Sequence, residues 1–186
     1  MKKTLLILFC FVFFGTACEK NSPITTIDSE METMREGGFE FEHPSDWKIS
    51  GIEDATATEK KKASYHFTHP KNKICRVSIE IYNLKDLSPE QLNKMIAMKA
   101  RELKENFAKA GYANFSFETS STGMISRKPA TRLTASGVKD GVTRKIVMDM
   151  MIYKNSFYAI SYQWLDSWSK RIESRLAEIA ATFHIL

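Results

Sequence analysis

The residues of this 186-residue sequence that could carry chemistry are its cysteines and a pair of histidines. Cys10 lies in an apolar run near the N-terminus, Cys18 follows three small residues, and Cys75 stands alone in the middle of the chain. His66 and His69 are three positions apart and close to Cys75 in sequence. Imidazole and thiolate bind zinc, and thiolate is also a nucleophile. These positions therefore raise three hypotheses, namely a lipidation site, a metal site and a reactive thiol.

Cys18 stands at the end of a leader-like segment. Residues 1–17 begin with two lysines and continue with an apolar run that is too short to span a bilayer, which takes about 20 residues. The sequence Gly15-Thr16-Ala17-Cys18 resembles the lipobox of bacterial lipoproteins, with glycine where that pattern prefers an aliphatic residue. We therefore expect a lipoprotein signal peptide over 1–17 and a palmitate-type lipid on Cys18. The alternative is an ordinary secretory signal, because Gly15-x-Ala17 also fits a small-x-small cleavage site.

Neither the histidine pair nor Cys75 is predicted to be a chemical centre. Zinc needs ligands that converge on one point, whereas side chains three positions apart on a strand point to opposite faces. We expect His66 and His69 to be surface histidines beside a turn. Cys75 opens a run in which apolar residues alternate with polar ones, which predicts a buried structural thiol. The sequence therefore predicts no catalytic residue, no metal ligand and no cofactor.

Hydrophobic periodicity predicts the elements that would position these side chains. A period of two predicts strands over 39–41, 63–68, 75–81, 115–117, 130–135, 145–153 and 157–164. Ser88, Pro89 and Gln91 indicate the start of a helix that ends at Gly111, and an apolar stripe predicts a second helix from about Ser167. Short turns join consecutive strands. We therefore expect an α+β fold with a central, largely antiparallel β-sheet flanked by helices.

The chain is predicted to hold one folded domain behind a tether. Residues 18–37 are mostly polar and show no apolar period, which predicts a lipidated Cys18 followed by a flexible tether, while 38–186 predict a single α+β domain. Hydrophobic residues make up 43% of the chain and charged residues 26%, which is typical of globular proteins. Removing Lys2 and Lys3 with the leader lowers the formal net charge from +5 to +3. That charge is too small and too dispersed to indicate nucleic-acid binding.

Five segments in a fixed order resemble PsbP-like domains, a family that includes the bacterial DcrB-like lipoproteins. They are the Gly-Gly-Phe-x-Phe-x-His-Pro-x-x-Trp opening (37–47), the Ser-Pro-Glu-Gln helix start (88–91), Lys-Pro-Ala-x-Arg (128–132), Tyr-Lys-Asn-Ser-Phe-Tyr (153–158) and a final helix that closes on Phe183. The resemblance covers most of residues 38–186 and implies a PsbP-like sandwich. It supplies no catalytic residues, and what it implies is binding to other proteins.

The sequence and the resemblance together lead to one expected function and one alternative. We expect a lipid-anchored envelope protein that acts as a non-catalytic protein-interaction or assembly module and not as an enzyme. Its expected partners are the membrane, through the lipid, and another envelope protein, while its oligomeric state is left open. Glu19 follows Cys18 in place of aspartate, which favours the outer membrane and a domain facing the periplasm. The alternative is an envelope small-ligand binder or enzyme that uses a cleft between sheet and helix.

Overall fold

The computed structural model describes residues 24–36, 38–50, 63–83 and 89–186. Its elements follow one another as β1 (Met31–Glu36), β2 (Phe39–Pro44), β3 (Lys48–Ser50), β4 (Ala63–Thr68), β5 (Arg76–Asn83), α1 (Pro89–Lys109), β6 (Ala113–Ile125), β7 (Lys128–Lys139), β8 (Val142–Tyr153), β9 (Ser156–Leu165), α2 (Lys170–Ala181) and β10 (His184–Ile185).

The strands form two sheets in which every pairing is antiparallel. The large sheet has the order β3-β4-β5-β9-β8-β7-β6, and the small sheet has the order β1-β2-β10. Three hairpins join β6 to β9 through two-residue turns at Ser126-Arg127, Asp140-Gly141 and Lys154-Asn155, all with positive φ. Such turns match the twist of the strands that they join. The predicted α+β sandwich is confirmed, and the small second sheet is an addition to it.

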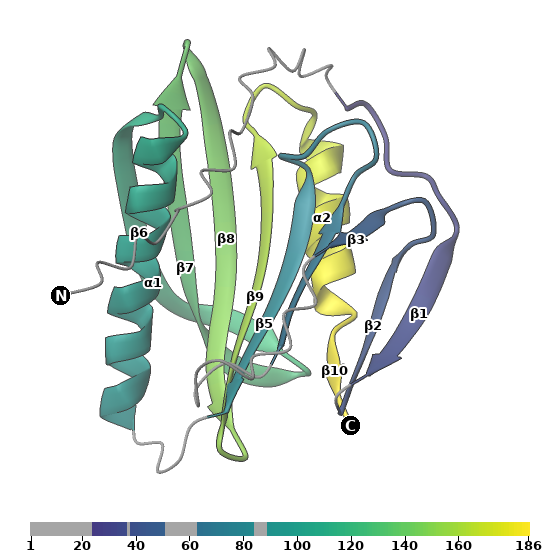
Figure 1. Ribbon diagram of the computed structural model, residues 1–186, viewed down its shortest axis with the longest axis vertical. Coiled ribbons are helices and arrows are strands. Elements are labelled where there is room, and N and C mark those ends of the chain that lie inside the picture. The colour runs from purple at the N-terminus through teal and green to yellow at the C-terminus, as the bar shows by residue number, and fades with distance from the viewer. Residues whose placement is uncertain (1–23, 37, 51–62, 84–88) are drawn as a thin grey trace, which may run out of the picture.

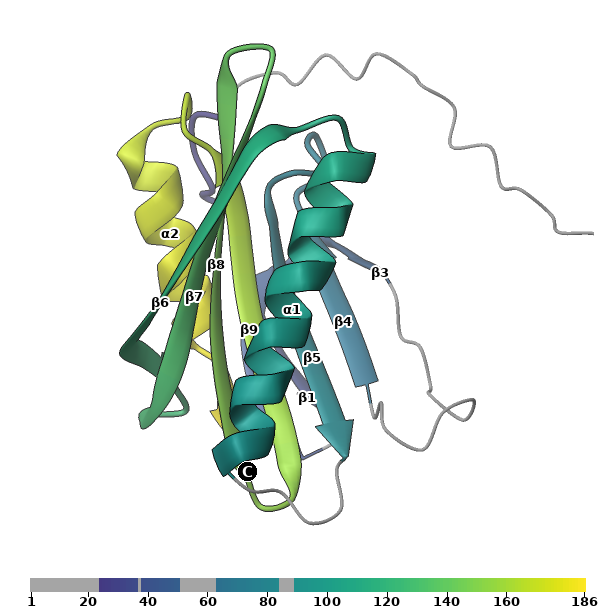
Figure 2. The same cartoon turned by 90° about the vertical axis from the view of Figure 1, so that its left-hand side faces the viewer.

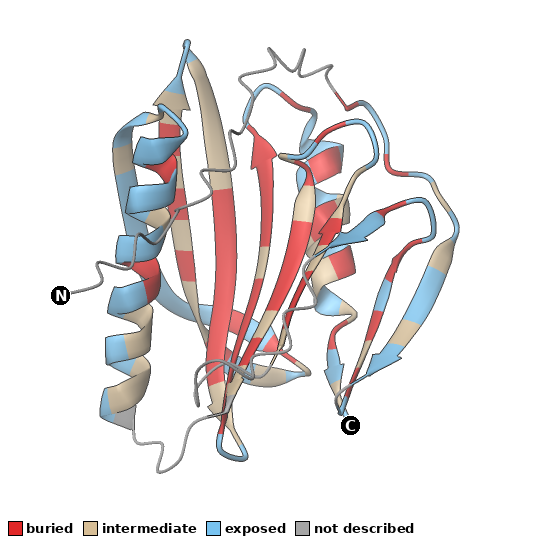
Figure 3. Cartoon of the chain, in the orientation of Figure 1, coloured by how far each residue is buried: buried red, intermediate tan, exposed pale blue. Residues whose placement is uncertain are grey.

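The molecule has three layers, with the large sheet in the middle (Figure 1). Helix α1 lies on one face of this sheet and crosses it at an angle, as the rotated view shows (Figure 2). Helix α2 and the small sheet lie on the opposite face. The larger core fills the side of α2 and the smaller core fills the side of α1. Burial is accordingly concentrated in β5, β8 and β9, in the middle of the sandwich (Figure 3).

Alternation along the central strands decides which side chains enter which core. On β5, Val77, Ile79 and Ile81 are buried toward α2 and the small sheet, and Phe39 and Phe41 of β2 meet them there. All five side chains are no more than 1% exposed, which confirms the predicted burial. The intervening residues of β5 therefore point toward α1.

Close packing of α1 depends on one glycine of the large sheet. Gly137 lies on β7 beneath the aromatic ring of Phe107 from α1, and a Cβ at this position would come within 2.4 Å of that ring. Because real Cβ atoms do not approach so closely, a side chain here would push the end of α1 away from the sheet. Strand β7 continues through this glycine to Lys139.

The folded domain begins earlier than the sequence predicts. Residues 24–36 were expected to be part of a flexible tether, yet Ile24 and Ile27 are buried in the larger core and β1 pairs along its whole length with β2. The segment is polar because β1 is an edge strand whose side chains are mostly exposed, so no alternation marks it. The tether boundary at residue 37 is therefore wrong, and the domain extends at least to Ile24.

The helices agree with their predicted apolar stripes. Helix α2 begins at Lys170, after Ser169, and not at about Ser167. Its buried positions include Ile172, Leu176 and Ile179. Ser88, the predicted cap of α1, lies outside the described residues. Among the described residues, no helix combines the length and the apolar character needed to cross a membrane.

Candidate functional site

A polar cleft lies between α1 and the half of the large sheet that α1 does not cover. Its volume is about 280 Å³. The side chains that β7, β8 and β9 direct toward α1 are largely apolar and form the smaller core, whereas β4 and β5 present Ser64, His66, Arg76, Ser78 and Glu80 on the same side. Helix α1 contributes Lys99 and Glu102 to the cleft. One face of a single sheet is thus divided into an apolar half under the helix and a polar half beside it.

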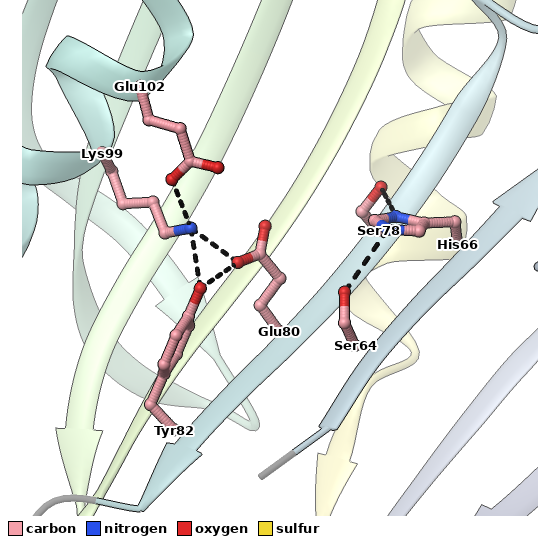
Figure 4. Close-up of polar contacts among 7 residues, drawn as sticks. All are labelled: Ser64, His66, Ser78, Glu80, Tyr82, Lys99 and Glu102. Atoms are coloured by element: carbon pink, nitrogen blue, oxygen red, sulfur yellow. Dashed lines mark hydrogen bonds and ion pairs between the residues drawn. The ribbon is translucent and has the colours of Figure 1, made fainter. Parts of the chain in front are cut away.

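Lys99 is the most deeply buried charge in this cleft. Its side chain is 2% exposed, and its Nζ donates to Glu80 Oε2 at 2.6 Å, to the Tyr82 hydroxyl at 2.9 Å and to Glu102 Oε2 at 2.9 Å. Tyr82 also donates to the same oxygen of Glu80 at 2.6 Å. Figure 4 shows these side chains converging from α1 and β5. An ammonium group has three N–H donors, and here all three are used.

The network holds its groups in defined protonation states. Burial alone would lower the pKa of Lys99, but the charge of Glu80 and the three hydrogen bonds outweigh it and raise the pKa above its ordinary value. Burial and the neighbouring Glu80 carboxylate raise the pKa of Tyr82 to about 12. Lys99 is therefore a cation and Tyr82 a neutral phenol at physiological pH. A protonated lysine is not an amine nucleophile, so this network is suited to positioning and charge recognition.

The structure separates the two histidines that the sequence places close together. His66 lies on β4 with its Nδ1 2.9 Å from Ser78 Oγ and its Nε2 3.3 Å from Ser64 Oγ, so it belongs to the cleft (Figure 4). It was expected at the surface beside a turn, whereas it is half-buried in the middle of a strand pair. His69 instead packs edge-on against Trp47, 6.2 Å away. Among the described residues, no group of three or more histidine, cysteine or acidic side chains could hold a metal ion.

Cys75 is fully buried in the larger core, away from the cleft. Burial raises the pKa of its thiol to about 12. Because the thiolate is the reactive form, we expect the native protein to react with iodoacetamide at Cys75 far more slowly than the same protein in guanidinium chloride. Mass spectrometry of the Cys75 peptide measures the two rates. Comparable rates in the two states would show that the thiol is accessible and would support the hypothesis of a reactive thiol.

Sequence reasoning missed the charged residues of the cleft. Arg76 and Glu80 belong to the polar side of a strand that was predicted to be half-buried, and Lys99 was not singled out. A signal was nevertheless present, since Leu92, Ile96, Lys99 and Leu103 follow helical spacing on one side of α1. A lysine among such positions indicates a buried cation that needs a partner. Cys18, the predicted lipidation site, lies outside the described residues.

The fold resembles that of known structures, although the sequence does not match any family. No protein-family model matches the chain, and no curated protein sequence does. The solution structure of cyanobacterial PsbP (CyanoP) from Synechocystis is similar with a TM-score of 0.60 and 15% identity, over 87% of this chain and 95% of that chain. A crystal structure from Bacteroides thetaiotaomicron has a TM-score of 0.50 and 16% identity, over 86% of this chain and 49% of its own. The mycobacterial protein LpqN, described as involved in cell envelope biogenesis, has a TM-score of only 0.41 at 14% identity, over 88% of this chain and 89% of its own.

These comparisons define a class of fold and nothing finer. The agreement with CyanoP extends over nearly the whole of both chains, so the protein has a PsbP-like fold, as the sequence resemblance implied. At 15% identity the likeness does not transfer a function. The narrower resemblance to DcrB-like lipoproteins stays a prediction from the sequence.

Proposed function

We propose that the mature protein is a lipid-anchored, non-catalytic protein-interaction or assembly module of the bacterial cell envelope. The leader over residues 1–17 and the lipobox-like cysteine support export and lipidation at Cys18. Glu19 supports placement in the outer membrane with the domain facing the periplasm. In this proposal the lipid supplies membrane attachment and the folded domain supplies the contact with another envelope protein.

The proposed contact with another protein is supported mainly by the exposed edge strand β6. This strand spans 13 residues, forms one edge of the large sheet and pairs only with β7 among the described residues. Two large apolar side chains on it, Phe117 and Met124, are each 54% exposed. An edge strand offers unpaired backbone donors and acceptors to a strand of another chain, and exposed apolar side chains add area for contact. The β6 edge is thus suited to binding an extended segment of a partner.

Site-specific crosslinking in cells tests this proposal. With a photo-crosslinking phenylalanine analogue at position 117, we expect a discrete adduct of defined mass in the membrane fraction. The same analogue at Glu105, an exposed position on α1, serves as the matched control and is expected to give no such adduct. Replacing Met124 with aspartate in the position-117 protein should weaken the adduct, because it puts a charge into the apolar part of the edge. Equal labelling from both positions, or none from β6, would contradict the proposal.

The alternative function, a small-ligand binder or an enzyme, is favoured by the charged cleft. Ligand sites are concave and carry a few polar groups in fixed positions, and the cleft beside α1 has these features. Binding is supported more strongly than catalysis, because the three N–H donors of Lys99 are occupied and Cys75 lies in the opposite core.

A further inference from the structure

Two guanidinium groups lie close to Gln163, and of the two only that of Arg76 lines the cleft. Arg76 of β5 lines the cleft and is the register partner of Gln163 on β9, and Arg144 of β8 donates through Nη2 to the Gln163 side chain. Burial is the main reason that the pKa of Arg144 is lowered, and the positive charge of Arg76 lowers it further. The two cations are therefore close enough to repel each other across one glutamine.

The charge of this pair is only partly compensated within the protein. Arg144 stacks its guanidinium over Phe107 at 5.1 Å, but its buried Nε has no hydrogen-bond partner among the described residues. The buried Nε of Arg76 has none there either. Glu80 attracts Arg76, yet its carboxylate is also the acceptor of Lys99 and Tyr82 at 2.6 Å. Two like charges held close together with little water around them are costly, so an anion bound in the cleft beside Arg76 would offset their repulsion.

Hydroxyl groups lie in the same part of the cleft. Ser78 and Ser161 bring them from β5 and β9, and His66 of β4 holds the Ser78 hydroxyl through its Nδ1 at 2.9 Å. A hydroxyl group can donate a hydrogen bond to an oxyanion, and a guanidinium is matched in geometry to carboxylate and phosphate oxygens. The volume of about 280 Å³ admits a small molecule.

We propose that the part of the cleft beside Arg76 is a binding site for a small ligand that carries a carboxylate or phosphate group, with the oxyanion held by Arg76. The site is separate from the β6 edge, and it rests on the alternative function, in which the cleft binds a small molecule. Arg76 supplies the positive charge that pairs with the oxyanion, Arg144 adds positive potential, and the hydroxyl groups of Ser78 and Ser161 fix the orientation of the ligand. The Lys99 network forms the other wall and keeps α1 at a fixed distance from the sheet.

Calorimetric titration of the full chain in detergent, with three probes at constant ionic strength, tests this site. The probes are inorganic phosphate, succinate and the neutral amide succinamide. We expect saturable binding of at least one of the two anions and none of succinamide. Tight binding of succinamide would mean that the cleft binds small molecules without requiring a negative charge. That result would overturn the proposed anion site and leave the alternative function, small-molecule binding, intact. Failure of all three probes to bind would overturn both.

Variants of Arg76 identify the residue that holds the anion. The change Arg76→Met is expected to weaken binding about tenfold to a hundredfold, the range for losing charge-assisted hydrogen bonds. Arg76→Lys keeps the charge but loses the paired N–H donors of the guanidinium, so it should weaken binding less than Arg76→Met. This variant also tests the site if the methionine variant does not fold. The control is Arg171→Gln, at a guanidinium that is 72% exposed on α2, and it should bind as the wild type does. Unchanged affinity in a folded Arg76 variant would overturn the assignment.

Discussion

Replacing Cys18 with serine is expected to convert a membrane-bound protein into an uncleaved or mislocalised precursor. In the proposed lipoprotein the lipid would be attached through a thioether to the cysteine sulfur, which serine cannot form. Each methylene buried in the bilayer contributes about 0.8 kcal/mol, so two or three acyl chains would hold the protein firmly and their loss would detach it completely. Fractionation of cells grown with a labelled fatty acid measures the outcome directly. The domain itself should stay folded, because its core begins at Ile24.

The matched control for this experiment is Cys10→Ser. Cys10 lies in the apolar part of the leader, and its replacement should leave lipidation and membrane attachment unchanged. If the wild-type protein takes up no fatty acid and is found in a soluble periplasmic or secreted fraction, residues 1–17 are an ordinary secretory signal and the lipoprotein proposal is wrong.

Replacing Glu80 with glutamine is expected to lower the free energy of unfolding by about 3 kcal/mol, because it leaves Lys99 buried without its main counter-charge. The side chains of Glu80 and Lys99 are 16% and 2% exposed, so water can replace the lost carboxylate only in part. Urea denaturation followed by circular dichroism measures the change.

Two further variants show whether the loss comes from the buried pair. Glu102→Gln removes the other acidic partner of Lys99, which is 51% exposed, and should cost less than about 1 kcal/mol. Combining Glu80→Gln with Lys99→Met removes both buried charges and should restore most of the stability, since an apolar replacement of a buried ion pair is often neutral. A Glu80→Gln protein as stable as the wild type would show that the network contributes nothing to the fold.

Much of the fold follows from alternation in the sequence, because one-sided burial leaves a clear period of two. The strand containing Val77 and Ile79 was predicted with the correct inward face, and β8 and β9 were found within a few residues of their ends. The stripe of α2 was likewise correct. Each of these elements buries one complete face, so the hydrophobic effect requires apolar residues at the inward positions and permits polar residues at the outward ones.

The features that were missed are those in which tertiary contacts override the local pattern. Edge strand β1 buries too little to show a period, so it was predicted to be tether. The polar side of β5 has the pattern of a solvent-exposed face, and only the position of α1 beside it makes that face one wall of a cleft. Nothing in the local sequence distinguishes Arg76 or Glu80 from a solvated side chain. The separation of His66 from His69 was predicted, but the partial burial of His66 depends on the position of α1.

The early start of the folded domain changes how far the proposed lipid anchor would let it travel. Ile24 is six positions after Cys18, and an extended chain covers at most about 3.5 Å per residue, so the core would begin within about 20 Å of the lipidated sulfur. Asp28 also reaches Arg171 at 3.3 Å, which joins this segment to the first turn of α2. The chain between the lipidated cysteine and the folded core would then be a short tether and not a long flexible linker. The N-terminal end of the folded domain would then stay within about 20 Å of the bilayer surface, so the anchor would leave the domain little freedom to move away from the membrane.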